Sequence, residues 1–188
     1  MSKIIHVCGT MGSGKTTLIR AFLDQHPFTP VTGDKPRPVA YVCAERELWV
    51  MGPYEPDLQT SGCDANKDTP WNYAEIQRRW EQGFTVVYEG LFMMNHTRGL
   101  GLWNHTKAVR VVRLTTSLDE ARAGVVARRA AQGNHDPLPA RFEDGLKGND
   151  VRAKNYEFKM RQAGCPTFKL SRSEALEKLN QIAQEAES

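Results

Sequence analysis

The sequence contains no apolar run that approaches the roughly 20 residues a helix needs to cross a bilayer. Its amino-terminal apolar stretch, Ile4–Cys8, is too short for the core of a signal peptide. We therefore expect a protein that stays in the cytosol and is not attached to a membrane. Internal repeats and low-complexity tracts are absent as well, which argues against solenoid and linker architectures.

Cysteine is scarce. The chain has four widely spaced cysteines and no C-x-x-C pair: Cys8, Cys43, Cys63 and Cys165. Such spacing predicts neither a disulfide framework nor a zinc site. We expect the four thiols to be reduced.

A strong net charge is also missing, since the total is +3 over 188 residues, of which 40% are hydrophobic and 25% charged. This composition is typical of a globular protein, and we predict a single domain over residues 1–188. The total hides an uneven distribution: residues 1–97 carry −2, residues 98–172 carry +8 and residues 173–188 carry −3. The basic segment, 98–172, is either a surface for phosphates or nucleic acid, or a set of arginines on solvated helix faces.

Hydrophobic patterns predict strands that alternate with helices. The expected strands cover residues 3–8, 39–43, 84–88, 109–114 and 166–170, and the expected helices cover 15–26, 69–80, 117–131, 150–163 and a last stretch from 171. Loops are expected at 27–38 and 52–69. This alternation predicts a three-layer α/β fold, in which a parallel sheet has helices on both faces.

Local signals place the starts of two helices and the edge of the sheet that binds ligands. Thr69, followed by Pro70, is expected to cap the second helix, and Ser171 with Glu174 forms a capping box for the last one. Ligands of such sheets bind at the carboxyl ends of the strands. Gly9, Glu45, Glu89 and Thr115 fall there.

Residues 9–16 match the phosphate-binding pattern G-x-x-x-x-G-K-[ST] between a predicted strand and a predicted helix. Glycines let the backbone curl so that its N–H groups point at phosphate oxygens, and the helix N-terminus adds positive potential. Lys15 would reach the β and γ phosphates, and the Thr16 hydroxyl would bind Mg²⁺. The expected nucleotide-binding residues are Gly9, Gly12, Ser13, Gly14, Lys15, Thr16 and Thr17.

The loop predicts a nucleoside triphosphate, with ATP and Mg²⁺ as the expected pair, but leaves the phosphate acceptor open. A GTPase would need N-K-x-D, and residues 66–69 have their aspartate one place early. A motor or AAA-type ATPase would normally be longer and carry D-E after an apolar strand, whereas the strand here ends Tyr88-Glu89-Gly90. A compact kinase fits better.

Two carboxylates are candidates for metal or proton handling. Glu89, at the end of a predicted strand beside the phosphate loop, would hold Mg²⁺ or take a proton from the acceptor, unless it is a structural surface glutamate. Asp64 lies among small residues in the 52–69 loop, which we expect to close over the acceptor. It would orient the acceptor hydroxyl or act as general base, or only form an Asx-turn. Asp34 and Glu45 are weaker candidates.

Arg128 and Arg129 end the predicted 117–131 helix, ahead of a Gly/Pro-rich loop that contains His135. In a kinase of this size, a lid at about 128–150 would deliver arginines to the transferring phosphate. At least one of the two could instead be an ordinary solvated helix end. Trp71, Tyr73 and Trp80 could stack on a base, but their helical spacing favours core packing for at least two of them.

The phosphate loop at 9–16, Val-Val-Tyr-Glu-Gly at 86–90 and the Arg128–Arg129 segment together resemble the small P-loop kinases, among them thymidylate and nucleoside kinases. The resemblance covers roughly residues 3–170 and implies a parallel sheet of order 2-3-1-4-5. More narrowly, Gly62-Cys63-Asp64, Glu89-Gly90-Leu91 and residues 127–134 are similar to the bacteriophage 5-hydroxymethyluracil DNA kinases.

That narrower resemblance implies ATP-dependent phosphorylation of the hydroxymethyl group of 5-hydroxymethyluracil in phage DNA, a step in thymine hypermodification. It makes Lys15, Glu89, Asp64, Arg128 and Arg129 the expected catalytic residues, and Thr16 with Glu89 the expected metal site. The basic segment agrees with a polymeric acceptor, and no D-R-[YFH] string follows the third strand. Two alternatives stay open: a kinase of free nucleosides, nucleotides or another small alcohol, and a nucleotide-dependent switch with negligible phosphotransfer.

Overall fold

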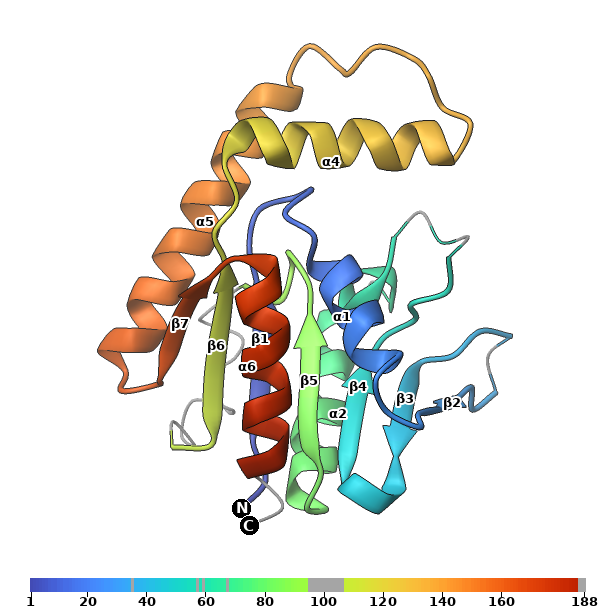
Figure 1. The fold of residues 1–188 in the computed structure, drawn as a ribbon, viewed down its shortest axis with the longest axis vertical. Helices are drawn as coiled ribbons and strands as arrows, with labels where there is room; N and C mark the ends of the chain where they lie inside the picture. Colours follow the sequence, from blue (N-terminus) through green and yellow to red (C-terminus); the bar gives the residue numbers. More distant parts are fainter. Residues whose placement is uncertain (35, 57, 59, 67, 95–106, 186–188) are drawn as a thin grey trace.

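The fold was analysed in a computed structural model that describes residues 1–34, 36–56, 58, 60–66, 68–94 and 107–185. Within them lies a seven-stranded sheet of order β2-β3-β4-β5-β1-β6-β7 (Figure 1). The strands are β1 (Ile4–Cys8), β2 (Thr29–Val31), β3 (Ala40–Cys43), β4 (Leu48–Met51), β5 (Thr85–Glu89), β6 (Val109–Leu114) and β7 (Thr167–Leu170). The helices are α1 (Lys15–Leu23), α2 (Thr69–Glu81), α4 (Leu118–Ala131), α5 (Phe142–Gln162) and α6 (Arg172–Glu185), with short 3₁₀ turns η1 (Ala44–Arg46) and η2 (Gly62–Asn66).

The prediction of a three-layer α/β fold is confirmed. Strands β4, β5, β1, β6 and β7 pair in parallel, in the order 2-3-1-4-5 that the resemblance implies. Apolar side chains of α2 and α5 pack on one face of this sheet, and those of α1 and α6 pack on the other. Figure 1 shows α4 lying across the carboxyl ends of the strands, above the phosphate loop.

The edge of the sheet near β2 differs from the sequence prediction. Residues 39–43 were expected to be the second parallel strand, but β3 is antiparallel to both of its neighbours, and the second parallel strand is β4. A one-turn η1 and the positive φ of Glu47 (50°) reverse the chain between β3 and β4. The stretch 27–38 contains the edge strand β2 rather than only a loop. Pro30 is tolerated there because an edge strand leaves backbone N–H groups unpaired.

Helix ends follow the predictions in part. Ser117 caps α4 in a reciprocal capping box with Glu120, and Glu174 accepts from the backbone and hydroxyl of Ser171 ahead of α6. The N-cap of α2 is Asp68, whose carboxylate accepts from Trp71 N, so Thr69 is already helical. The shift is one residue, and an aspartate caps as well as a threonine does.

Helix α5 begins at Phe142 instead of near residue 150. The predicted lid segment at 128–150 therefore consists of the end of α4, a connection over 132–141 and the first turns of α5. All four cysteines are buried free thiols. No helix in the described part of the chain is long and apolar enough to cross a membrane.

Candidate active site

The phosphate loop connects the end of β1 to the start of α1, as predicted. Gly12 and Gly14 have φ of 79° and 91°, in the left-handed region that favours glycine. Helix α1 starts without a side-chain cap and without an acidic residue in its first turn. Its first N–H groups and its positive dipole end are therefore not neutralised by the helix's own side chains, which suits a phosphate. The Ser13 hydroxyl is buried and has no hydrogen-bond partner among the described residues.

The loop packs tightly against α4. A Cβ placed on Gly12 would overlap the carbonyl group of Ala121, and a Cβ on Gly124 would lie 2.6 Å from the Gly12 carbonyl oxygen. Two glycines thus let the phosphate loop and α4 approach backbone to backbone. This contact fixes the helix that carries Arg128 and Arg129 relative to the loop.

Lys15 lies folded over the phosphate loop. Its Nζ donates to the carbonyl oxygens of Gly9 (3.2 Å) and Thr10 (3.0 Å). Burial lowers the pKa of Lys15, while the nearby carboxylate of Glu89 raises it. The ammonium group is therefore held by weak neutral acceptors that a phosphate oxygen could replace with a stronger, charge-assisted bond.

Glu89 and Thr16 meet at the carboxyl ends of β5 and β1. Thr16 Oγ1 donates to Glu89 Oε1 at 3.3 Å, and the Glu89 side chain is buried. Burial raises the pKa of Glu89 to about 7, although the positive charge of Lys15 lowers it. Because Glu89 is buried beside the phosphate loop, the alternative of a solvent-exposed structural glutamate does not hold. A hydroxyl and a carboxylate oxygen this close form a donor set that suits Mg²⁺.

Asp64 makes long-range hydrogen bonds to the backbone rather than the Asx-turn offered as the alternative to catalysis. Its two carboxylate oxygens accept from the backbone N–H groups of Leu91 (2.7 Å) and Phe92 (3.1 Å), the residues that follow β5. A Cβ on Gly90 would lie 2.7 Å from Asp64 Oδ1, so the glycine leaves room for the carboxylate to make these two hydrogen bonds. Asp64 therefore connects η2 to the segment after β5 and still lines the cavity described below.

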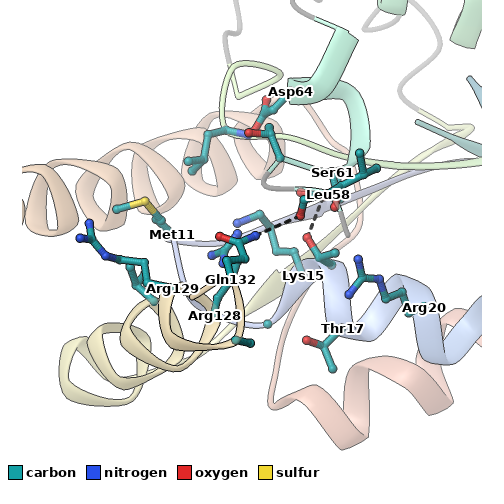
Figure 2. Close-up of a pocket in the computed structure, with 18 of the residues that line it drawn as sticks. Met11, Lys15, Thr17, Arg20, Leu58, Ser61, Asp64, Arg128, Arg129 and Gln132 are labelled. Carbon is teal, nitrogen blue, oxygen red and sulfur yellow. Dashed lines mark hydrogen bonds between the residues drawn. The ribbon is translucent and has the colours of Figure 1, made fainter. Parts of the chain in front are cut away.

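The two predicted arginines differ in their surroundings. The charge of Arg128 acts on the pKa of both Lys15 and Glu89. Arg129 donates instead to Asn134 Oδ1 (2.9 Å) and the Asp136 carbonyl (3.2 Å) in the exposed loop after α4. Figure 2 shows the Arg129 side chain pointing away from Lys15. Arg128 is thus the better placed of the two for a transferring phosphate.

A cavity of about 640 Å³ brings most of the predicted site residues together, although Gly9 and Ser13, two of the expected nucleotide-binding residues, do not line it. The phosphate loop, the 56–64 part of the 52–69 loop, the end of β5 and the end of α4 all contribute to its wall. Its lining residues include Gly12, Gly14, Lys15, Thr16, Thr17, Asp64, Glu89, Arg128 and Arg129. Asp34 and Glu45, the weaker carboxylate candidates, do not line it; both are exposed on the β2–β4 side of the sheet.

Arg20 and Gln132 are among the lining residues that the sequence analysis does not predict. Arg20 donates from Nε to the Tyr54 carbonyl (2.7 Å) and from Nη2 to the Glu55 carbonyl (2.6 Å), which attaches the 52–69 loop to α1. Gln132 Nε2 donates to the Leu58 carbonyl (3.3 Å) from the opposite wall (Figure 2). Arg20 lies one turn beyond Thr16, and that i+4 spacing could have placed it on the same side of α1.

The remaining sequence candidates lie elsewhere. Tyr73 and Trp80 pack against the core, which confirms core packing for two of the three aromatic residues of α2. Trp71 is partly exposed and does not line the cavity. Part of the basic segment is structural, because Arg113 pairs with the buried Glu157 at 3.1 Å. Residues 98–106 of that segment lie outside the described residues.

A strand, a glycine-rich phosphate loop and a helix, with a buried carboxylate on the neighbouring parallel strand, define a P-loop nucleotide-binding protein. Residues 4–147 match the AAA_33 family profile, described as an AAA domain. The 5-hmdU DNA kinase of Pseudomonas phage PaMx11 is 30% identical over 190 residues, which is 97% of this chain and 97% of the phage protein. The chain belongs to this family of P-loop kinases, and it is a phosphotransferase, as the sequence predicts.

A solved structure adds little to this assignment. The deoxyadenosine kinase from M. mycoides with bound dATP aligns at 16% identity and a TM-score of 0.37, covering 95% of this chain and 99% of that one. A likeness at this level carries no argument about the acceptor. The family profile is described as an AAA domain, whereas the phage relative that aligns over 97% of this chain is named a kinase.

Proposed function

We propose that this protein transfers the γ-phosphate of ATP to the hydroxymethyl group of 5-hydroxymethyluracil in phage DNA, a step in thymine hypermodification in the host cytosol. The observation that carries the proposal is the 5-hmdU DNA kinase relative, whose similarity extends over 97% of the chain and so includes the stretches that contribute Ser61, Asp64, Glu89 and Phe92 to the cavity wall. The net charge of +8 on residues 98–172 supports a polyanionic acceptor.

The donor side of the reaction follows from the phosphate loop. The backbone over residues 9–14, the Lys15 ammonium and the start of α1 would hold the triphosphate, with Thr17 on the same turn of the helix. The paired oxygens of Thr16 and Glu89 fit Mg²⁺, which when bound neutralises charge on the phosphates. No cluster of three or more His, Cys, Asp or Glu side chains suited to a metal occurs among the described residues, so the phosphates themselves would complete the set.

In the transfer step, the hydroxymethyl oxygen attacks the γ-phosphorus, the bond from that phosphorus to the β–γ bridging oxygen breaks, and ADP leaves. The hydroxyl proton passes to a carboxylate. We assign this proton to Glu89, whose buried carboxylate lies at the end of β5 on the wall of the cavity. Its Oε1 lies against Thr16, on the metal side, and we assign Oε2 to the acceptor hydroxyl.

Arg128 would stabilise the charge on the transferring phosphoryl group, because it lines the cavity and its charge acts on the pKa of both Lys15 and Glu89. Arg129 would hold the 132–141 connection in place through Asn134 and Asp136. Asp64 would position the segment after β5 through its two backbone hydrogen bonds.

The test offers γ-labelled ATP and Mg²⁺ together with four acceptors: DNA that contains 5-hydroxymethyluracil, the same DNA with thymine, free 5-hydroxymethyldeoxyuridine, and a panel of common nucleosides and nucleotides. We expect label in the first DNA alone. Label confined to free nucleosides or nucleotides would show a small-molecule kinase, and tight ATP binding without any labelled acceptor would show a switch.

Two variants check the assignment of the site. Lys15→Ala should abolish transfer to every acceptor, whereas Arg78→Ala, at an exposed arginine of α2 that pairs with Glu75 outside the basic segment, should transfer normally. The affinity for unmodified DNA should fall steeply between low and moderate salt, since phosphate contacts release counterions. Binding that does not depend on salt would contradict a role of the basic segment in holding the DNA backbone.

A further inference from the structure

Phe92 is exposed where a core residue would be expected. Its side chain is 62% exposed, while the adjacent Met93 and Met94 are 1% and 5% exposed. The large apolar side chains exposed in the described part of the chain are Met1, Trp71, Phe92, Val126, Val151 and Phe158. Of these six, Phe92 is the one that lines the active-site cavity. Among the described residues that line this cavity, it is also the only aromatic one.

The backbone that carries Phe92 is fixed from three sides, although it belongs to no helix or strand. Asp64 accepts from the N–H groups of Leu91 and Phe92, the Tyr73 hydroxyl donates to the Met93 carbonyl at 2.6 Å, and Met94 N donates to the Leu91 carbonyl at 3.3 Å. An exposed aromatic ring on a mobile loop would lose conformational freedom on binding. Because the backbone around Phe92 is already ordered in the folded protein, less conformational entropy is lost when a ligand binds to the ring.

The proposed acceptor requires an apolar partner of this kind. A base that leaves the helical stack to reach the γ-phosphate loses its stacking neighbours, which costs a few kcal/mol and has to be offset by the protein. An aromatic ring offers a face of matching size and excludes water from it. Glu89 and Phe92 line the same cavity. A base stacked on Phe92 within this cavity could therefore present its hydroxymethyl group to the carboxylate.

We propose that Phe92 stacks on the acceptor base after the base has left the DNA helix, and that Asp64 is the positioning residue that holds Phe92 at the cavity wall. This inference rests on the proposed function, because it takes the acceptor to be a base in DNA. It adds a specificity-determining contact to the acceptor base itself, whereas the phosphate loop acts on the nucleotide and Glu89 acts on the hydroxymethyl group.

The first test compares KM and kcat of Phe92→Ala, Phe92→Leu and Phe92→Tyr on DNA that contains 5-hydroxymethyluracil. Loss of one stacked base corresponds to a factor of about 5 to 150 in binding. Phe92→Ala should therefore raise KM for DNA by about 5- to 150-fold with kcat nearly unchanged. Phe92→Tyr should restore the wild-type KM, and Phe92→Leu, apolar but without a ring face, should not. ATP affinity should be the same in all three variants.

Phe158→Ala is the matched control, since Phe158 is similarly exposed (48%) but lies on α5 and does not line the cavity. Its KM should equal that of the wild type. A readout without turnover uses DNA with 5-iodouracil in place of the acceptor base: on irradiation we expect a crosslink that maps to Phe92 and that is lost in Phe92→Ala. A crosslink that maps only to other residues contradicts the proposal.

Single-stranded and duplex DNA separate two roles of an exposed ring. A ring that stacks on the acceptor base is needed with both substrates, so the KM effect of Phe92→Ala should be similar in both. A ring that instead fills the gap left in the duplex would matter for duplex alone, and that result overturns the proposal. A wild-type enzyme that labels only free nucleosides overturns the proposed function and this inference together. A wild-type enzyme that labels DNA, with KM unchanged in Phe92→Ala, overturns this inference alone.

Discussion

Thr16 Oγ1 donates a hydrogen bond to Glu89 Oε1 at 3.3 Å, although the two residues are 73 positions apart in the chain. The contact exists because β1 and β5 are parallel neighbours with Val7 in register with Glu89, and because the phosphate loop returns the chain to the end of β1 as α1 begins. It places a buried carboxylate of raised pKa against the first turn of the phosphate-binding helix.

The raised pKa of Glu89 should make stability depend on pH. Burial raises it from 4.5 to about 7 in the folded protein, so the folded state binds the proton more tightly than the unfolded state does. The resulting stability is fully present below pH 4.5 and is lost as the pH rises through about 7. Relative to Glu89→Gln, which does not titrate, the wild-type free energy of unfolding should fall by about 3 kcal/mol from about pH 4 to about pH 8.

Urea unfolding of the two proteins without nucleotide, across that pH range, measures this difference. A gap between wild type and Glu89→Gln that stays constant with pH would show that the pKa of Glu89 is not raised. The same variant should lose phosphoryl transfer by about a hundredfold or more at every pH, as expected for a proton acceptor and metal-holding group.

Substitutions at Asp64 should separate a positioning role from a proton-accepting role. Asp64→Asn keeps one carbonyl oxygen for the N–H groups of Leu91 and Phe92, whereas Asp64→Ala leaves both without this partner. We expect Asp64→Ala to lower the free energy of unfolding by about 2–3 kcal/mol and Asp64→Asn by about 1 kcal/mol. The kcat of Asp64→Asn should stay within about tenfold of wild type. A loss of a thousandfold or more would identify Asp64 as the general base. Asp144→Ala, at an exposed aspartate of α5, serves as the control.

Arg128 and Arg129 should differ in their effect on catalysis. Arg128→Ala removes the cation that faces Lys15 and Glu89, and we expect kcat to fall by about 10²–10³-fold. Arg129→Ala removes hydrogen bonds to Asn134 and Asp136 in the exposed loop and should lower kcat by less than about tenfold. Steady-state kinetics on the same DNA substrate measures both. Equal losses would mean that the loop after α4 rearranges and delivers both arginines to the phosphate.

The contact between Gly12 and α4 should be sensitive to a single methyl group. Gly12→Ala forces an L residue into φ 79° and drives its Cβ into the Ala121 carbonyl, so we expect a loss of about 2–5 kcal/mol in the free energy of unfolding. Gly133→Ala has a similar φ of 73° but meets nothing within 4 Å, and it should cost only about 1–2 kcal/mol. Denaturant unfolding of the two variants, side by side, isolates the packing contribution. Equal losses would mean that the loop and α4 can move apart.

Local sequence signals predicted most of the parallel sheet and the donor half of the site. The phosphate pattern lies within eight consecutive residues, so its backbone geometry needs no distant partner, and residues 109–114 carry the apolar pattern of a buried strand that β6 matches residue for residue. The antiparallel edge was misread, because β2 contains Pro30 and β4 follows β3 after one short turn. Such short strands are stabilised by their neighbours in the sheet rather than by their own propensity.

By itself, the amino-acid sequence determined the class of protein, a P-loop kinase, and it predicts that Lys15 and Thr16 bind the nucleotide beside a carboxylate at residue 89. Only the tertiary structure decided between residues with the same local signal. It placed the charge of Arg128 near Glu89 and tied Arg129 to the exposed loop after α4. It connected Asp64 by hydrogen bonds to the backbone of residues 91 and 92, and Arg20 to the 52–69 loop. It also left Phe92 exposed on the cavity wall. Each of these outcomes depends on which distant backbone groups lie within hydrogen-bond reach, and that is set by the pairing and packing of the sheet.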